Sequence, residues 1–315
     1  MKILFIAKCD YSGLTEGICR AFEQLGHQAR IFDLKRYRRR KKYITADYPG
    51  WRLSSQLKSF IPDIVFAIAP LYIDQLIYRQ LGVYRARKNF LSVGWIGDLF
   101  QDSPEHLRKI RFYDRLYYTD TGMEGMLRGF PSFYLPLATD PDLFGKLNLG
   151  TGSTDGCAFV ASWTENREKF LSKVNRPISV WGPGWKIRRE NIPQHVVRPG
   201  AISLSRTGKI YSQAKTVLNL KNARNVINGL NQRSFDPLAC RALMLHDSVG
   251  DLQRNFEPGK EILVFDSTEE FHFLHDKAMK DEFFRRTIAE QGYRRVVSCH
   301  TFLHRAKSIL SDLNL

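Results

Sequence analysis

The sequence contains no long hydrophobic run. None of its apolar stretches approaches the roughly 20 residues that a membrane-spanning helix needs, although 43% of its 315 residues are hydrophobic. The apolar start at residues 1–7 is too short for a secretory signal and precedes no small-residue cleavage site. We therefore expect a globular protein of the cytoplasm, with or without peripheral attachment to a membrane.

Cysteine is scarce and shows no paired spacing. The five cysteines lie far apart, at positions 9, 19, 157, 240 and 299. This distribution excludes a disulfide framework and a zinc motif of the Cys-x-x-Cys type. No other motif stands out as a metal site, so we expect neither a metal nor an essential cofactor.

Acidic residues are fewer than basic ones. The chain has 48 Lys and Arg against 32 Asp and Glu, which gives a net charge of +16. The excess is shared by both halves of the chain. Such a charge indicates an anionic partner, which is nucleic acid, an acidic membrane surface or a phosphorylated small molecule. No feature of the sequence predicts a protein partner.

What the sequence does contain is an alternation of predicted strands and helices. Residues 2–7 form an apolar run, residues 14–25 carry apolar side chains at helical spacing, and residues 29–34 form a second run. This strand–helix–strand order is typical of parallel sheets. Further strands are predicted at 63–69, 90–96, 115–119 and 132–137.

A second alternating series begins after a polar segment. Residues 145–156 are rich in Gly, Ser and Thr and lack periodicity, which is typical of a linker. Strands are predicted beyond it at 157–162, 178–182, 195–199, 216–220, 242–247 and 261–265. We predict an α/β protein of two Rossmann-like, doubly wound domains, 1–145 and 156–315, that face a central cleft.

Polar residues cluster immediately before an apolar segment at 228–245. We expect a helix at 232–240 whose N-terminus binds phosphate through its unpaired N–H groups. Arg233 adds a cation that can form two hydrogen bonds, and Ser234 adds a hydroxyl donor. Asp236 adds an acceptor for ribose hydroxyls. A capped helix with solvated charges is the alternative interpretation.

Glycine-containing turns follow two neighbouring predicted strands, in "VWGPGW" and "VVRPG". In doubly wound sheets ligands bind outside the carboxyl ends of the strands, and glycine lets the backbone approach a ligand closely. Gly182 and Gly200 therefore join the candidate site. Two ordinary tight turns are the alternative.

Residues 156–310 resemble the CgeB-like (spore-maturation type) glycosyltransferases. The resemblance is carried, in the family's order, by "FVASWTENREKFL", "VWGPGW", "GLNQRSFDPLACRALMLHD" and "FEPGKEILVFDSTEEF". It implies a GT-B fold and a hexosyl- or pentosyltransferase. In that fold the C-terminal domain holds the nucleotide-sugar donor, and a UDP-sugar is the expected one.

The resemblance also implies roles for individual residues. It assigns the donor diphosphate to Arg233 and Ser234, the ribose to Asp236, and the base to the loop Arg198–Gly200. The other donor-binding candidates are Ser162, Trp163, Trp181, Gly182, Tyr211, Asn219 and Asn231. Many retaining enzymes of this fold carry two acids eight positions apart, but Asn228 occupies the first position here. The choice between inverting and retaining chemistry stays open.

An inverting transfer needs a general base that takes the proton of the acceptor hydroxyl. Asp98 follows a predicted strand of the N-terminal domain, in "GWIGD", and ranks first. Asp10 and Glu16 of the first loop are its rivals. A role for Asp98 as a helix cap or turn residue is the alternative. His246 and His300 are expected to be structural.

A basic run at 35–42 contains seven basic residues in eight. Its candidate acceptor-binding residues are Arg38, Arg39, Arg40, Lys41 and Lys42. A solvated loop, an anionic membrane surface and a nucleic-acid backbone all fit this run.

These observations predict a glycosyltransferase that acts on a hydroxyl of an anionic or membrane-associated acceptor, such as a cell-envelope or surface glycoconjugate. A bacteriophage-type enzyme that glycosylates hydroxylated bases of DNA is the first alternative. The second is a non-catalytic protein that binds nucleotides or polyanions.

Overall fold

Two compact units make up the chain. The structure is a computed structural model that describes residues 1–9, 13–40, 48–100, 103–145 and 154–315, with the backbone alone at 38–40 and 154–155. Unit 1 comprises Met1–Pro136 and Arg305–Leu315, and unit 2 comprises Leu137–His304. This division differs from the expected one, because the C-terminal segment joins unit 1. Residues 146–153 of the expected linker lie outside the described residues.

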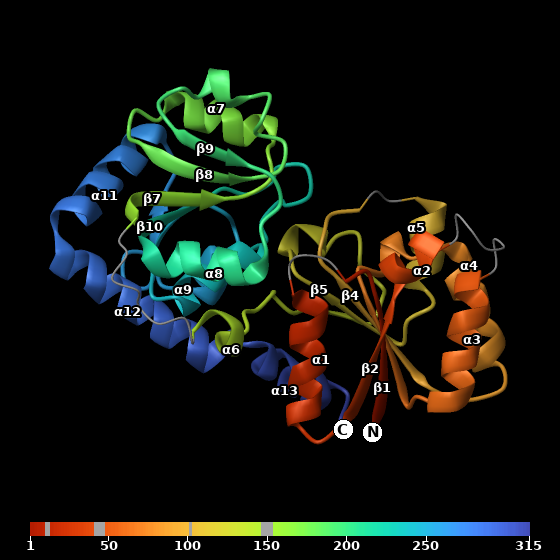
Figure 1. Ribbon diagram of the computed structural model, residues 1–315. Helices are drawn as coiled ribbons and strands as arrows, with labels where there is room; N and C mark the ends of the chain where they lie inside the picture. The colour runs from red at the N-terminus through yellow and green to blue at the C-terminus, as the bar shows by residue number, and fades with distance from the viewer. Residues whose placement is uncertain (10–12, 41–47, 101–102, 146–153) are drawn as a thin grey trace. The chain divides into compact units, whose positions relative to one another are not determined.

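Unit 1 is built on a six-stranded parallel sheet in the order β2-β1-β3-β4-β5-β6 (Figure 1). Its strands are β1 (Lys2–Ala7), β2 (Gln28–Asp33), β3 (Ile64–Ile68), β4 (Leu91–Ile96), β5 (Arg115–Tyr118) and β6 (Ser132–Tyr134). Its helices are α1 (Leu14–Gln24), α2 (Leu34–Arg40), α3 (Tyr48–Phe60), α4 (Gln75–Arg85), α5 (Pro104–Ile110) and most of α13 (Phe302–Asp312).

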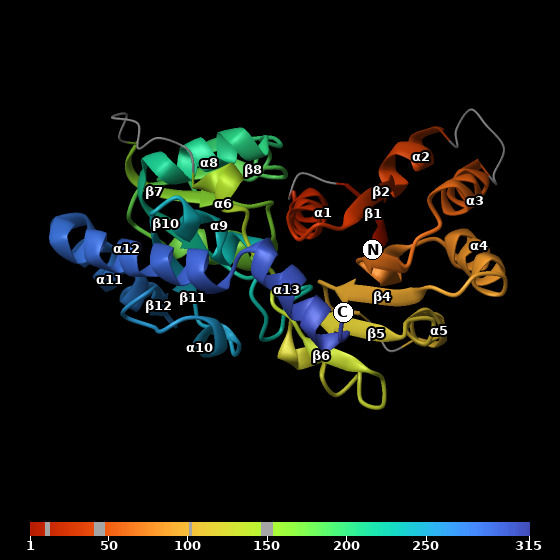
Figure 2. The same ribbon diagram turned by 90° about the horizontal axis from the view of Figure 1, so that it is seen from below.

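Helices cover both faces of this sheet, as Figures 1 and 2 show. On one face, Phe22 of α1 packs against Phe5 and Phe66, with ring centroids 5.8 and 6.3 Å from its own. On the other face, α3 buries Leu53 and Leu57. Strand β1 is buried almost throughout because it is covered on both sides. Its sequence is therefore a continuous apolar run rather than an alternation.

Unit 2 contains a second six-stranded parallel sheet, in the order β12-β11-β10-β7-β8-β9. Its strands are β7 (Thr154–Val160), β8 (Ile178–Gly182), β9 (Val196–Pro199), β10 (Ala214–Asn219), β11 (Leu243–Asp247) and β12 (Leu263–Phe265). Its helices are α6 (Pro141–Phe144), α7 (Glu165–Lys173), α8 (Leu204–Gln213), α9 (Asp236–Ala239), α10 (Leu252–Asn255), α11 (Thr268–Lys280) and α12 (Glu282–Cys299).

Successive residues of the unit 2 strands face two separate cores. Val217 of β10 packs with Ile210 of α8 and Leu238 of α9, whereas Leu218 packs with Leu171 of α7 and Phe271 of α11. Helices thus cover both faces of this sheet as well. The prediction of two Rossmann-like, doubly wound α/β units is confirmed. Within the described ranges, every helix is too short or too polar to cross a lipid bilayer.

Candidate functional site

The carboxyl ends of β7 and β10 lie side by side in unit 2. Strand β7 pairs with β10 on one side and with β8 on the other. The chain leaves β7 toward β8, whereas it leaves β10 toward β11 in the opposite direction. Such a divergence opens the crevice in which doubly wound sheets bind their ligands. The residues that follow these two strands therefore form the candidate site.

The turn after β8 packs directly on the chain after β7. Gly182 has φ +141°, and a Cβ atom at this position would lie 2.2 Å from the carbonyl oxygen of Ala161. The same oxygen accepts a hydrogen bond of 2.8 Å from the indole nitrogen of Trp185. Gly184, with φ +87°, lies against Trp163. These glycines thus bring two turns of the protein itself into contact, which is one of the two interpretations that the sequence left open.

Arg167 joins the chain after β7 to the chain after β10. It lies in the first turn of α7 and is only 2% exposed. Its Nη1 donates to the carbonyl oxygen of Ser162 (2.9 Å), and its Nε and Nη2 donate to that of Leu220 (3.2 and 2.8 Å). Burial, with a smaller contribution from the guanidinium of Arg233, lowers the pKa of Arg167 to about 9. Two arginines therefore share a poorly hydrated region.

Arg167 was not among the residues predicted for the site, although the sequence carries a signal for it. Arg167, Leu171 and Val174 recur at helical spacing, and the last two belong to the core beneath α7. An arginine on the apolar face of a helix is unusual, because charged residues are seldom buried without partners. The neighbouring charges of "ENREK" concealed the pattern.

The segment between β10 and β11 is not the helix that the sequence predicted. Gln232–Ser234 form a 3-10 turn, and α9 has only four residues. The N–H groups of Ser234 and Phe235 already donate to the carbonyl oxygens of Asn231 and Gln232. Pro237 has no N–H with which a continuous helix could bond across the turn. The prediction of an open helix N-terminus at 232–240 is therefore wrong, and the side chains remain as candidates.

Ser234 belongs to a buried hydrogen-bonded network. It is fully buried, its Oγ lies 2.8 Å from Nε2 of His246, and it accepts from Nδ2 of Asn219 (3.0 Å). On the other side of the imidazole, Nδ1 lies 2.6 Å from the carbonyl oxygen of Asp247. The hydroxyl that was expected to bind phosphate is therefore engaged within the protein. Its network holds the carboxyl ends of β10 and β11 together.

Arg233 is the side chain of this segment that lacks a partner. Its Nε atom is buried, and no hydrogen-bond acceptor reaches it among the described residues. Burial lowers the pKa of Arg233, and electrostatic interactions with Tyr211 and Asp236 only partly oppose this effect. No carboxylate in the described part of the chain forms an ion pair with it. A half-buried guanidinium whose buried Nε has no partner favours binding of an anion.

Asp236 has a raised pKa. Burial raises it to about 8, although Thr139 donates a hydrogen bond of 2.7 Å to its Oδ1 and Arg233 lies nearby. The residue is 5% exposed. In its protonated form it leaves the positive charge of Arg233 uncompensated.

The other predicted donor-binding residues differ in their exposure. Ser162, Arg198 and Gly200 are exposed, whereas Trp181 and Tyr211 are buried. The guanidinium of Arg198 lies 5.0 Å from the ring centroid of Trp181 and so covers it. Trp181 and Tyr211 thus support the site from within the core, and the exposed residues remain accessible to a ligand.

The predicted catalytic and acceptor residues lie in unit 1. Asp98 follows β4, is half-buried, and contributes to the raised pKa of Tyr72, which is caused mainly by burial. Glu16 lies in the first turn of α1, and its Oε2 is buried without a hydrogen-bond partner among the described residues. Asp10, Lys41 and Lys42 lie outside the described residues. Arg38, Arg39 and Arg40 end helix α2, where only the backbone is described.

The arrangement in unit 2 is suited to an anion rather than to a metal ion. Arg167, which is buried, and Arg233, whose Nε atom is buried, supply two positive charges, and charges shielded from water interact strongly with an anion. Preorganised charges of this kind also stabilise negative charge that develops on a leaving group. Among the residues that the structure describes, no group of three or more His, Cys, Asp or Glu is arranged to hold a metal.

Residues 161–311 match the family model described as "Glycosyl transferase-like". The match includes Arg167, Arg233 and the ends of β8 to β12. No curated protein sequence matches the chain.

Solved structures resemble the whole chain. HepE from Anabaena in complex with UDP has a TM-score of 0.71 at 11% identity, over 100% of both chains. Sucrose-phosphate synthase from Thermosynechococcus elongatus has a TM-score of 0.70 at 12% identity, over 100% of this chain and 98% of the other. The DNA-modifying enzyme β-glucosyltransferase has a TM-score of 0.65 at 13% identity, over 100% of both chains. The chain therefore has the GT-B fold.

Residues 161–311 are thus similar to glycosyl transferases, and the chain as a whole has the GT-B fold.

Proposed function

We propose that the chain is a glycosyltransferase that moves a sugar from a UDP-sugar to a hydroxyl of an anionic or membrane-associated acceptor, such as a cell-envelope or surface glycoconjugate. The two neighbouring arginines, Arg167 and Arg233, carry the donor part of the proposal. The structures of HepE with UDP support the choice of nucleotide. The net charge of +16 supports an anionic acceptor. The motifs of residues 156–310 support a relative of the spore-maturation type.

In this proposal Arg233 binds the donor diphosphate directly. Its Nε–H has no partner within the described residues, so a phosphate oxygen gains a charge-assisted hydrogen bond without breaking another one. The N–H groups of Arg167 are already bonded to two carbonyl oxygens. Arg167 therefore acts through its charge. Asp236 serves as the contact of a ribose hydroxyl.

For the transfer itself we propose that Asp98 is the general base, with Glu16 and Asp10 as rivals. The carboxylate takes the proton of the acceptor hydroxyl while its oxygen attacks the anomeric carbon. The bond from that carbon to the diphosphate breaks, and UDP leaves with its negative charge stabilised by Arg233 and Arg167. This step inverts the anomeric configuration.

Calorimetry with UDP tests the donor site. Arg233→Ala removes a charge-assisted hydrogen bond and should weaken UDP binding by about 1.5–3 kcal/mol. Arg233 makes no hydrogen bond or ion pair in the described part of the chain. The melting temperature of the Arg233→Ala protein without ligand should therefore barely differ from that of wild type. Arg286→Ala is the matched control, since Arg286 is an exposed arginine on α12. Equal affinity of Arg233→Ala and wild type would remove Arg233 from the site.

DNA is the second candidate acceptor. The net charge of the chain and its likeness to a DNA-modifying β-glucosyltransferase favour it. Replacing Arg38, Arg39 and Arg40 with Ser should weaken a duplex complex and reduce its salt dependence, because each phosphate contact releases counterions. Donor binding should be unaffected. If this variant loses binding only to anionic liposomes, the result would favour the envelope acceptor. If it loses binding only to DNA, the result would favour the DNA-modifying enzyme.

A further inference from the structure

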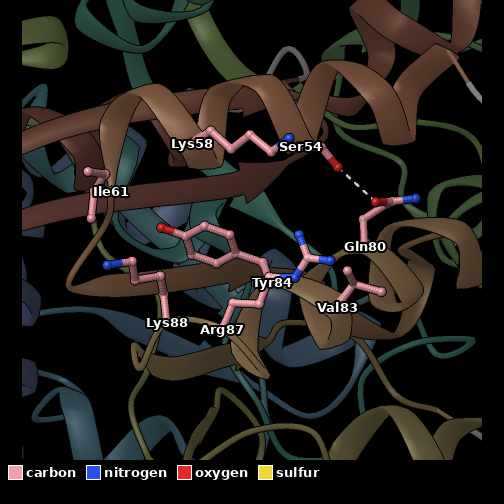
Figure 3. A pocket seen from close by; sticks show the side chains of 8 residues that line it. All are labelled: Ser54, Lys58, Ile61, Gln80, Val83, Tyr84, Arg87 and Lys88. Carbon is pink, nitrogen blue, oxygen red and sulfur yellow. Dashed lines mark hydrogen bonds between the residues drawn. The ribbon is translucent and has the colours of Figure 1, made fainter.

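A cavity of about 240 Å³ lies between α3 and α4 in unit 1 (Figure 3). Its lining residues come from these two helices and from the turns that lead into β3 and β4. It therefore lies toward the amino ends of the strands, at the opposite edge of the sheet from Asp98. Its volume is below the roughly 300 Å³ at which pockets begin to enclose a drug-sized molecule. It fits one segment of a ligand rather than a whole ligand.

The cavity combines apolar walls with a cationic rim. Ile61, Val83 and the ring of Tyr84 supply apolar surface, and the exposed side chains of Lys58, Arg87 and Lys88 surround it. Ser54 and Gln80 also line it, but they bond to each other at 2.7 Å, and Figure 3 shows them together away from Ile61. Residues 48–60 and 75–90 contain no Asp or Glu at all. The positive charge of this surface is therefore not neutralised by its own helices.

Tyr84 carries a polar group without a partner into this cavity. Its hydroxyl is buried, and no hydrogen-bond partner reaches it among the described residues. In Figure 3 the hydroxyl points toward Ile61, with Lys58 on one side of it and Lys88 on the other. Buried polar atoms of native proteins are almost always bonded. An oxygen of a ligand at the cationic rim would satisfy this hydroxyl.

Ile61 is held in a strained conformation at the rim. Its φ is +50°, in the left-handed region that β-branched residues avoid. Its side chain is 52% exposed, so packing does not compensate for the strain. Val83 and Trp51 on the neighbouring helices are also exposed, at 48% and 61%. The left-handed conformation ends helix α3, where the N–H of Ile61 donates to the carbonyl oxygen of Leu57 at 2.9 Å. A β-branched, exposed residue at such a position, beside two other exposed apolar side chains, is typical of a functional surface.

We propose that the α3–α4 cavity binds a lipid of an anionic membrane. An apolar segment of the lipid enters between Ile61, Val83 and Tyr84. Its phosphate lies at the rim, between Lys58, Arg87 and Lys88, and accepts the hydrogen bond of the Tyr84 hydroxyl. This contact docks unit 1 on the bilayer surface.

Charge and shape complementarity both favour this occupant. Free phosphate satisfies the rim but leaves the apolar walls and Ile61 unused. Duplex DNA also satisfies the rim, yet its backbone offers no apolar group for the cavity. A lipid of an anionic bilayer matches both parts, because basic side chains at such a surface and apolar insertion act together.

Flotation of the full chain with vesicles, in the absence of any donor, tests the proposal. Wild type should bind vesicles of equal phosphatidylglycerol and phosphatidylcholine and should not bind phosphatidylcholine alone. The variant Lys58→Gln, Arg87→Gln and Lys88→Gln should bind roughly 100-fold more weakly, since each basic side chain at the surface contributes about fivefold. The matched control Lys169→Gln, Lys173→Gln and Lys280→Gln changes the net charge equally on exposed helix positions of unit 2.

A second variant separates docking from folding. Ile61→Asn relieves the positive φ and should raise the melting temperature while it lowers vesicle binding about tenfold. Ile187→Asn removes an exposed isoleucine of unit 2 and should leave vesicle binding unchanged. A purely structural role for Ile61 predicts that stability and binding change in the same direction or that binding stays constant.

Small ligands distinguish a cavity from a charged patch. Octyl phosphate below its micelle concentration should raise the melting temperature of wild type and not of Tyr84→Phe, whereas inorganic phosphate should have little effect on either.

The proposal is overturned if wild type does not bind anionic vesicles at moderate salt, or if both triple variants lose vesicle binding equally. The proposal is also overturned if the variant of Lys58, Arg87 and Lys88 loses binding to duplex DNA but not to vesicles. The surface would then be a nucleic-acid site. Because no donor or turnover is involved, these outcomes are independent of the proposed transfer.

Discussion

Arg167 donates two hydrogen bonds to the carbonyl oxygen of Leu220, from Nε at 3.2 Å and from Nη2 at 2.8 Å. With the bond from Nη1 to Ser162, they tie together the chain segments that follow β7 and β10. The candidate donor site of unit 2 is therefore built around a guanidinium that the protein itself has already engaged.

Removing this guanidinium should damage both stability and donor binding. Arg167→Leu removes the donors of the buried carbonyl oxygen of Leu220 and of the partly buried one of Ser162, and we expect the free energy of unfolding to fall by about 2–4 kcal/mol. Arg167→Lys keeps the charge but cannot make all three hydrogen bonds. Its loss of stability should therefore lie between those of wild type and Arg167→Leu. Denaturant unfolding followed by calorimetry with UDP measures both effects. An Arg167→Leu protein as stable as wild type would contradict the role described for this residue.

The buried carboxyl group of Asp236 should make stability depend on pH. Because burial raises its pKa from 3.8 to about 8, the folded protein keeps a proton there that the unfolded chain releases between these values. The contribution of this group to stability is therefore fully present below about pH 4 and is lost as the pH rises to about 8.

Asp236→Asn cannot ionise and should lack this dependence. We expect its free energy of unfolding to exceed that of wild type by several kcal/mol near pH 9 and to approach the wild-type value near pH 4. Urea unfolding at both pH values measures the difference. If the difference between the two proteins is the same at each pH, Asp236 is ionised in the folded protein.

Gly182 should tolerate no side chain. A Cβ atom there would lie 2.2 Å from a backbone oxygen that cannot move without disturbing the turn after β7, so Gly182→Ala should cost at least about 3 kcal/mol of stability. Gly200→Ala is the matched control. Gly200 also has a positive φ, +110°, but has open space around it, and we expect a cost of about 1–2 kcal/mol from strain alone. Similar melting temperatures for the two variants would argue against the close contact.

Asp98→Asn should reduce turnover by about 10²–10⁴-fold if Asp98 is the general base. Affinity for UDP should stay at the wild-type value, because Asp98 lies in unit 1 and the proposed donor contacts lie in unit 2. Steady-state kinetics with the identified acceptor, alongside calorimetry, measures this. Glu16→Gln is the comparison, since its carboxyl group also lies near the carboxyl edge of the unit 1 sheet. Normal turnover in Asp98→Asn with a loss in Glu16→Gln would transfer the role to Glu16.

The two-unit α/β architecture was predictable because its signals are local. Apolar runs such as residues 2–7 and 64–68 appear wherever a parallel strand is covered by helices on both faces. Helical spacing in residues 14–25 marked the intervening helix in the same way. The place of residues 305–315 in unit 1 could not be read from the sequence, because the contacts of this segment with unit 1 are not local. Tyr117, for example, donates to Asp312 over 195 positions of sequence.

The candidate site was predictable only in part. Arg233 and Asp236 were selected because a cation and a carboxylate follow a buried strand, and in the structure the two side chains interact with each other. Ser234 has the same sequence context, yet its hydroxyl is hydrogen-bonded to His246, a residue of the next strand. The helix expected at 232–240 is interrupted by the 3-10 turn and Pro237.

By itself the sequence determined the order of strands and helices, the excess of positive charge and the short list of polar residues after the strands of unit 2. Only the tertiary structure decided which of those residues are available to a ligand. Availability depends on burial and on partners from distant segments, as with Arg167 and Leu220, which are 53 positions apart. The cavity between α3 and α4 has the same origin, because its apolar and basic residues become one surface only when the two helices pack side by side.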